Sequence, residues 1–140
     1  MKILVAVDGS PFTKRMLAYL AAHDEWLGAR HEYTVLNAVP AVPPRAAAVI
    51  DRNTLQSYYD EESAKVFEPI RAFFAQQKIA AEFVSKVGPA ADVIAETATQ
   101  GKYDLLILGS HGHGTLTNLV MGSVATKVLA HCGTPALLIR

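Results

Sequence analysis

The sequence LLILGSHGHGTLTNLVMGSV, residues 105–124, decides the fold, because it joins an apolar strand, a glycine-rich loop and the start of an amphipathic helix. A loop that runs from a strand into a helix N-terminus presents backbone N–H groups to an anion. The glycines at 109, 112 and 122 stand where the chain must turn sharply, approach a ligand or enter the helix. We therefore interpret this stretch as a phosphate-binding loop.

The chain upstream of this loop begins with a strand, a tight turn and a helix. Residues 2–7 form an apolar run without polar alternation, which predicts a strand covered on both faces, as in a parallel sheet. Ser10 and Pro11 then predict the N-cap and first residue of a helix that ends near Gly28. A second strand is predicted over residues 33–39, and the three prolines within residues 40–44 predict a loop after it.

The rest of the chain repeats this alternation. The spacing of Asn53 and Gln56 is that of a capping box and predicts a helix, which Pro69 bends. Two more helices are predicted, one from residue 89 to Gly101 and one from about residue 120 to the stop signal at Gly133, with strands over residues 81–87, 105–108 and 136–139. Five strands alternating with four helices predict one α/β domain, residues 1–140, with a doubly wound parallel sheet.

Composition excludes several classes of function. Thirteen basic and thirteen acidic residues give a formal net charge of zero, so no overall field attracts nucleic acid or an anionic membrane. The apolar N-terminal run stops at Asp8, too early for a signal peptide or a membrane span. We therefore expect a cytoplasmic protein that binds neither nucleic acid nor membrane. The 51% of hydrophobic residues suggests that a partner subunit covers part of the surface.

The glycine spacing matches neither of two common phosphate-binding motifs. The chain has no Gly-Lys-Ser/Thr of the Walker type, and Thr117 stands where the dinucleotide motif needs its third glycine. In a doubly wound sheet, ligands bind beyond the carboxyl ends of the strands, where the winding reverses. This rule places Asp8, Val39 and the loop after Leu108 at one crevice.

These features together resemble the universal stress protein family over the whole chain. The resemblance is carried by Val7-Asp8-Gly9-Ser10 after the first strand, by Val39 closing the second, and by GSHG followed nine residues later by GSVA. The spacing Gly-x2-Gly-x9-Gly-Ser resembles the signature of the ATP-binding branch of that family. The resemblance implies an ATP-binding homodimer with strand order 3-2-1-4-5, an adenine nucleotide alpha-hydrolase-like fold and a dimer interface at the last strand, Ala136–Ile139.

The same resemblance implies a set of contacts with ATP. The adenosine end is implied at Ala6, Val7, Asp8 and Val39, the ribose at Leu108 and Gly109, and the phosphates at Gly112, Gly122, Ser123 and Val124. A helix start at Gly122 and Ser123 does offer unpaired N–H donors, and an ionised Asp8 accepts hydrogen bonds from a ribose hydroxyl or an adenine amino group. The alternative for Asp8 is a turn residue that caps local N–H groups, and the alternative for the glycines is turn geometry without a ligand. Ser10 is interpreted as a helix cap.

One departure from the family concerns positive charge in the phosphate loop. Family members often carry Arg or Lys there, whereas residues 109–126 of this chain contain neither and Lys127 is the first cation. His111 and His113 stand in the loop instead, and imidazoles that titrate near neutrality would give conditional positive charge. We hypothesise that both contact phosphate. The alternative is that both are exposed loop residues.

Other chemistries have weaker support in the sequence. A metal site is not predicted at His111, His113, His131 and Cys132, because a structural zinc site needs four ligands at one point and His131 is expected at the far end of the helix from the loop. Ser110 beside His111 is not a hydrolase nucleophile elbow, since position 108 is Leu rather than Gly. A nucleotidyl transferase would need a histidine-glycine motif after the first strand, and the chain has none there.

The sequence therefore favours an ATP-binding, homodimeric stress-response regulator. Mg²⁺ or Mn²⁺ would be held by the phosphates, and hydrolysis would be slow or absent, because no general base, arginine finger or carboxylate pair accompanies the glycines. No catalytic residue is predicted. The alternative is a nucleotide-free interaction module that works through its dimer and residues 40–52.

Overall fold

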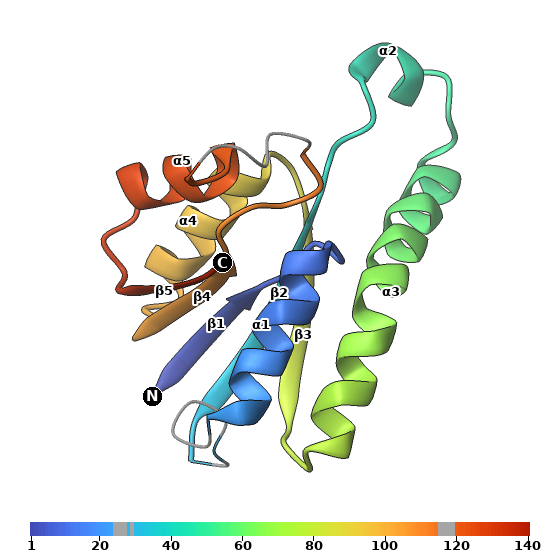
Figure 1. The fold of residues 1–140 in the computed structure, drawn as a ribbon. Coiled ribbons are helices and arrows are strands. Elements are labelled where there is room, and N and C mark those ends of the chain that lie inside the picture. Colours follow the sequence, from blue (N-terminus) through green and yellow to red (C-terminus); the bar gives the residue numbers. More distant parts are fainter. Residues whose placement is uncertain (24–27, 29, 115–119) are drawn as a thin grey trace.

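The computed structural model describes residues 1–23, 28, 30–114 and 120–140 and shows strands and helices alternating along the chain (Figure 1). The strands are β1 (Lys2–Ala6), β2 (Glu32–Val39), β3 (Ala81–Val87), β4 (Leu105–Gly109) and β5 (Ala136–Ile139). The helices are α1 (Pro11–Ala22), α2 (Pro44–Ala47), α3 (Arg52–Gln76), α4 (Ala90–Gln100) and α5 (Ser123–His131).

The five strands form one parallel sheet in the order β3-β2-β1-β4-β5, which the family resemblance implied. Strand β1 lies at the centre, with β2 on one side and β4 on the other. The winding reverses between β1 and β4, so their carboxyl ends form the switch point where such sheets bind ligands. Strand β5 lies at an edge of the sheet, paired with β4.

Helices cover both faces of the sheet, which explains the continuous apolar run in β1. Alternate residues of β1 enter two separate cores, because successive side chains of a strand point to opposite faces. Ile3 and Val5 pack with Met16 of α1 and Phe74 of α3, whereas Leu4 packs on the other face, with α4 and α5. The molecule therefore has three layers, with the sheet between two layers of helices (Figure 1).

Two local predictions differ from the structure. The described residues contain five helices, not four, because Pro44 begins a single helical turn where the sequence predicted only a loop; proline is preorganised for the first helical position, and the alanines after it favour a helix. Helix α3 is capped by Asp51, whose carboxylate accepts hydrogen bonds from the N–H groups of Asn53 and Thr54, so the predicted capping box at Asn53 was wrong.

The helix boundaries in the sequence prediction also shift. Helix α5 starts at Ser123, so the expected start near Val120 was too early, and Val120 lies before the helix with 81% of its surface exposed. Helix α1 ends at Ala22. The predicted continuation toward Gly28 falls mostly on residues 24–27, which lie outside the described residues.

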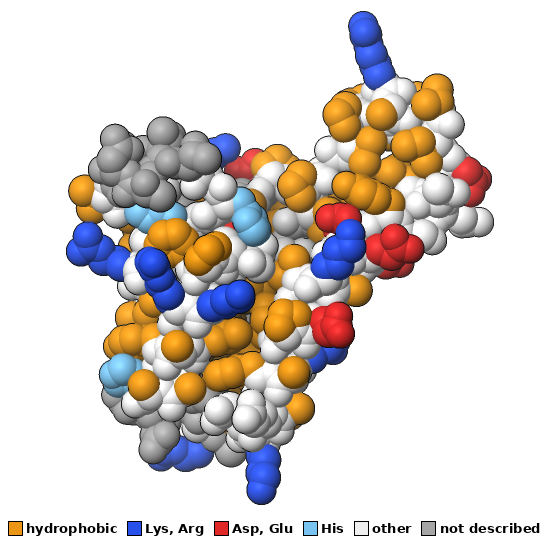
Figure 2. Space-filling view, turned by 45° about the vertical axis from the view of Figure 1, so that its right-hand side comes forward, with side chains coloured by type: hydrophobic (Ala, Val, Ile, Leu, Met, Phe, Trp, Pro, Cys, Tyr) orange, Lys and Arg blue, Asp and Glu red, His pale blue; other side chains and the backbone are white. Residues whose placement is uncertain are grey.

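The segment between β2 and α3, residues 40–51, projects from the body of the molecule, and we name it the projecting arm (Figure 1). A hydrogen bond attaches the arm to α3: the N–H of Val42 donates to the hydroxyl of Tyr59 at 2.9 Å. The arm exposes apolar side chains, Val49 at 85% and Ile50 at 36% (Figure 2). Within the described part of the chain, no helix combines the length and the apolar character that crossing a membrane requires.

Candidate functional site

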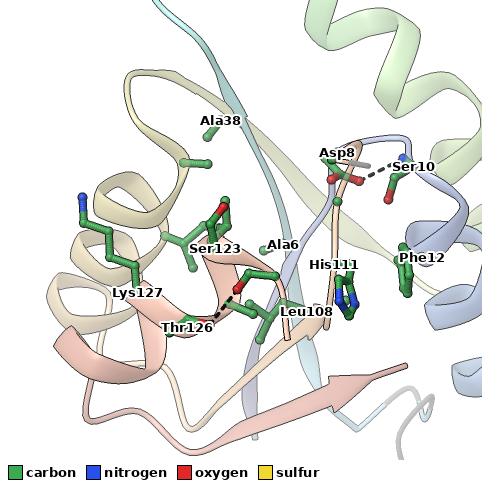
Figure 3. A pocket seen from close by; sticks show the side chains of 18 of the residues that line it. Ala6, Asp8, Ser10, Phe12, Ala38, Leu108, His111, Ser123, Thr126 and Lys127 are labelled. Carbon is green, nitrogen blue, oxygen red and sulfur yellow. Dashed lines mark hydrogen bonds between the residues drawn. The ribbon is translucent and has the colours of Figure 1, made fainter. Parts of the chain in front are cut away.

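A cavity of about 660 Å³ lies at the switch point, between the carboxyl ends of the central strands and the start of α5 (Figure 3). It is lined by every residue that the sequence placed at the site except Val39: Ala6, Val7, Asp8, Leu108, Gly109, His111, Gly112, His113, Gly122, Ser123 and Val124. The volume falls within the range of about 300–1,000 Å³ that small-molecule sites occupy. The topology therefore brings the end of β1 and the loop after β4 to one hollow.

Asp8, at the end of β1, is held firmly by its own turn. Its Oδ1 accepts a hydrogen bond from the N–H of Ser10 at 2.9 Å and another from the hydroxyl of Thr13 at 3.0 Å. This is the local capping that the sequence offered as the alternative for Asp8. Because both bonds go to Oδ1, they fix the side chain while Oδ2 points toward Gly112. A fixed carboxylate in a cavity is a preorganised acceptor for hydroxyl or amino groups.

The signature glycines are required by the packing of the loop itself. A Cβ on Gly112 would lie 2.6 Å from Oδ2 of Asp8, and a Cβ on Gly109 would lie 2.8 Å from Cβ of Phe12. A Cβ on Gly122 would lie 3.0 Å from the carbonyl oxygen of Ser110. None of these three glycines has a positive φ, so shortage of space rather than backbone conformation excludes a side chain.

The start of α5 forms the part of the cavity suited to an anion. The N–H of Gly122 donates to the carbonyl oxygen of Ser110 at 2.6 Å, so this donor is used within the loop and not left unpaired as the sequence suggested. The N–H groups of Ser123, Val124 and Ala125 belong to the first turn and have no acceptor in their own helix. These N–H groups lie at the positive end of the α5 dipole, a position that favours the binding of a phosphate group.

Val39 does not line the cavity, and Leu36 and Ala38 contribute from β2 instead. The reason is the alternation of the strand. Leu36 and Ala38 face the core under α4 and α5, whereas Val39 has the parity of Val35, which faces the core under α1 and α3. The cavity has an apolar floor, formed by Ala6, Leu36, Ala38 and Leu108.

The two loop histidines have defined partners. Nε2 of His113 lies 2.6 Å from the backbone carbonyl oxygen of Asp8, which joins the loop to the end of β1. This nitrogen therefore carries a hydrogen and donates it. His111 lies beside the ring of Phe12, with ring centroids 5.1 Å apart, and its Nδ1 is 3.0 Å from the hydroxyl of Ser110. Both rings line the cavity, and both hold the loop against the elements around it.

Ser10 and Lys127 are among the lining residues that the sequence analysis did not place at the site. Ser10 takes the N-cap position of α1 but makes no capping bond with its side chain, and its buried hydroxyl finds no hydrogen-bond partner among the described residues. Lys127 lines the cavity from α5, one helical turn after Ser123. Its spacing of four residues from Ser123 could have placed Lys127 at the site, because residues i and i+4 share a helix face.

Comparisons with known proteins agree with this geometry. The family model described as the universal stress protein family matches residues 1–140. The chain is 31% identical over 138 residues to a Thermus aquaticus protein described as a universal stress protein in the QAH/OAS sulfhydrylase 3' region, covering 99% of this chain and 97% of that one. Among solved structures, universal stress protein UspA from Lactobacillus plantarum matches with a TM-score of 0.78 and 22% identity, covering 100% of this chain and 97% of that one.

Two further solved structures contain a nucleotide. A universal stress protein family protein from Arabidopsis thaliana with AMP bound matches with a TM-score of 0.70 and 15% identity, over 99% of this chain and 90% of that one. The universal stress protein from Archaeoglobus fulgidus in complex with dAMP matches with a TM-score of 0.68 and 18% identity, over 100% of this chain and 98% of that one. Because the family model spans the whole chain, the chain belongs to the universal stress protein family.

Proposed function

We propose that this protein is an ATP-binding, homodimeric stress-response regulator. The observation that carries the proposal is the convergence of Asp8, the glycine loop and the first turn of α5 on one cavity. The apolar floor made by Ala6, Ala38 and Leu108 suits the adenine ring, and Asp8 suits a ribose hydroxyl or the adenine amino group. The phosphates then lie against the N–H groups of the α5 first turn.

The bound nucleotides of solved relatives support the adenine part of this proposal. Both nucleotides named above are adenine nucleotides with one phosphate, and their hosts share the fold of this chain. The step from AMP to ATP rests on the glycine spacing. In this proposal the side chain of Val39 does not contact the nucleotide, because Ala38 rather than Val39 lines the cavity.

In this proposal, Mg²⁺ or Mn²⁺ is held by the phosphates. Among residues 1–23, 28, 30–114 and 120–140, no three His, Cys, Asp or Glu side chains gather closely enough to hold a metal ion. Phosphate oxygens and water are ligands that Mg²⁺ accepts readily. The protein supplies the cavity, and turnover of ATP is slow or absent because the loop carries no arginine finger or carboxylate pair.

The homodimer is proposed at β5, the edge strand. Its residues Ala136, Leu137 and Leu138 are only half-buried in the single chain, although they are apolar. An uncovered apolar edge strand pairs readily with another chain, so a second copy would both bury these side chains and complete the backbone hydrogen bonds. The protein is proposed to work in the cytoplasm.

The experiment that tests the proposal is mass spectrometry of protein purified without added nucleotide, followed by calorimetric titration with ATP. We expect ATP in the parent protein and none in Gly122→Val, because a side chain at 122 meets Ser110 and the Cα of His111 at about 3 Å. Gly133→Val is the matched control, since a Cβ there has no neighbour within 4 Å among the described residues and Gly133 does not line the cavity. Absence of nucleotide in the parent, with no binding on titration, refutes the proposal.

A second candidate function has its own observation. The projecting arm exposes two adjacent apolar side chains, Val49 at 85% and Ile50 at 36%, and contiguous apolar surface is a feature of interaction sites. A nucleotide-free interaction module would use this surface and the dimer. The same titration separates the two functions, because the module binds no adenine nucleotide in either parent or variant.

A further inference from the structure

Lys127 supplies the cavity with a fixed positive charge that the loop lacks. Residues 109–126 contain no Lys or Arg, and the described lining residues include Lys127 as their one such side chain. Histidines at 111, 113 and 131 also line the cavity. Unlike an imidazole, the ammonium of an exposed lysine is charged throughout the neutral pH range. The electrostatics of the cavity therefore depend on where Lys127 can reach.

The position of Lys127 follows from the geometry of α5. Ser123 is the first residue of the helix, and Lys127 lies four residues later, which is a rise of about 6 Å on the same helix face. In Figure 3, Asp8 and Ser10 stand at one side, Ser123 in the middle and Lys127 at the other side. A ligand held at Asp8 and at the first turn of α5 thus extends toward Lys127.

Lys127 already forms an ion pair with Asp92, and this ion pair is weak. Its Nζ lies 3.7 Å from Oδ1 of Asp92 in the first turn of α4, with the two side chains 54% and 59% exposed. Exposed pairs at such a distance contribute little to stability. Asp92 does not line the cavity. If a phosphate group takes the place of the Asp92 carboxylate as the partner of Lys127, the protein therefore loses little stability.

We propose that Lys127 makes the cavity bind ATP more tightly than AMP. Its ammonium group leaves the carboxylate of Asp92 and binds the terminal phosphates of ATP. The inference rests on the proposed function, since it assumes an adenine nucleotide in the cavity. A nucleoside monophosphate ends at the first turn of α5, before it reaches Lys127. A triphosphate carries more negative charge and extends further along the helix. Lys127 thus distinguishes ATP from AMP, and Asp92 competes with the phosphates for the ammonium group.

The test is calorimetric titration of ATP and AMP into parent, Lys127→Gln and Asp92→Asn, at one fixed magnesium concentration. We expect Lys127→Gln to weaken ATP binding roughly three- to tenfold and to leave AMP binding unchanged. Asp92→Asn should strengthen ATP binding, because it removes the competing carboxylate. Rising salt should reduce the preference of the parent for ATP over AMP but not that of Lys127→Gln.

Lys65→Gln is the matched control. Lys65 also forms an exposed ion pair, with Glu62 at 3.0 Å, but it lies on α3 outside the cavity. Lys65→Gln therefore changes the net charge by the same amount as Lys127→Gln without altering the cavity. A parent that binds neither nucleotide refutes the proposed function and this inference together. Binding of both nucleotides, with Lys127→Gln weakening ATP and AMP by the same factor or weakening neither, refutes the inference alone.

Discussion

Replacing Gly112 by alanine should destabilise the fold in a way that depends on Asp8. The new Cβ would lie 2.6 Å from Oδ2 of Asp8, whereas ordinary contact begins near 3.4 Å, so the groups must separate by about 0.8 Å. Asp8 cannot turn away freely, because Ser10 and Thr13 hold its Oδ1. Overpacking of this kind costs about 1–3 kcal/mol. We expect a loss of about 1–2 kcal/mol, since the half-buried loop can yield in part.

The free energy of unfolding, measured by urea denaturation without ligand, checks this expectation. Gly114→Ala is the control, because its Cβ has no described neighbour within 4 Å and the residue has no positive φ; its stability should equal or slightly exceed that of the parent. In an Asp8→Ala background, Gly112→Ala should cost nothing further, because the carboxylate is gone. Equal costs of Gly112→Ala with and without Asp8 would show that the reasoning is wrong.

Two further predictions concern single side chains. Ser10→Ala should raise the free energy of unfolding in urea by about 1 kcal/mol, since it removes an unpaired buried hydroxyl, and a loss of stability would contradict this. Burial raises the pKa of Tyr33 above 10.0, so folding stability should fall as pH rises above that value. Tyr33→Phe should flatten the alkaline side of a thermal-denaturation profile, and an unchanged slope would contradict the assignment.

Much of the fold was predictable because its signals are local. Unbroken apolar runs showed where buried parallel strands lie, and β3 and β5 were placed at their observed bounds. The strand order came instead from the family resemblance, and the structure confirmed it. The turn at Pro44 was missed because proline signals both a loop and a helix start, and the sequence alone does not decide between them.

The candidate site was predictable where it depends on backbone and not where it depends on side-chain direction. The glycines and Asp8 were found from spacing, and they do meet at the cavity. Val39 was placed there although the parity of β2 turns its side chain away and brings Ala38 in. Lys127 was noted only as the first cation after the loop, because its place beside the cavity depends on the start of α5 at Ser123.

The crowding around Gly109, Gly112 and Gly122 has an evolutionary consequence. Because each glycine fits against a neighbouring atom of the same chain, a mutation at any of them is penalised in folding before a ligand is involved. Natural selection for a folded protein would therefore preserve the glycine spacing in a lineage that had stopped binding nucleotide. The residues free to drift in such a lineage are those whose side chains serve the ligand, and among them Lys127 should change early. Comparing the substitution rates of these two groups of positions across descendants would date the loss of binding.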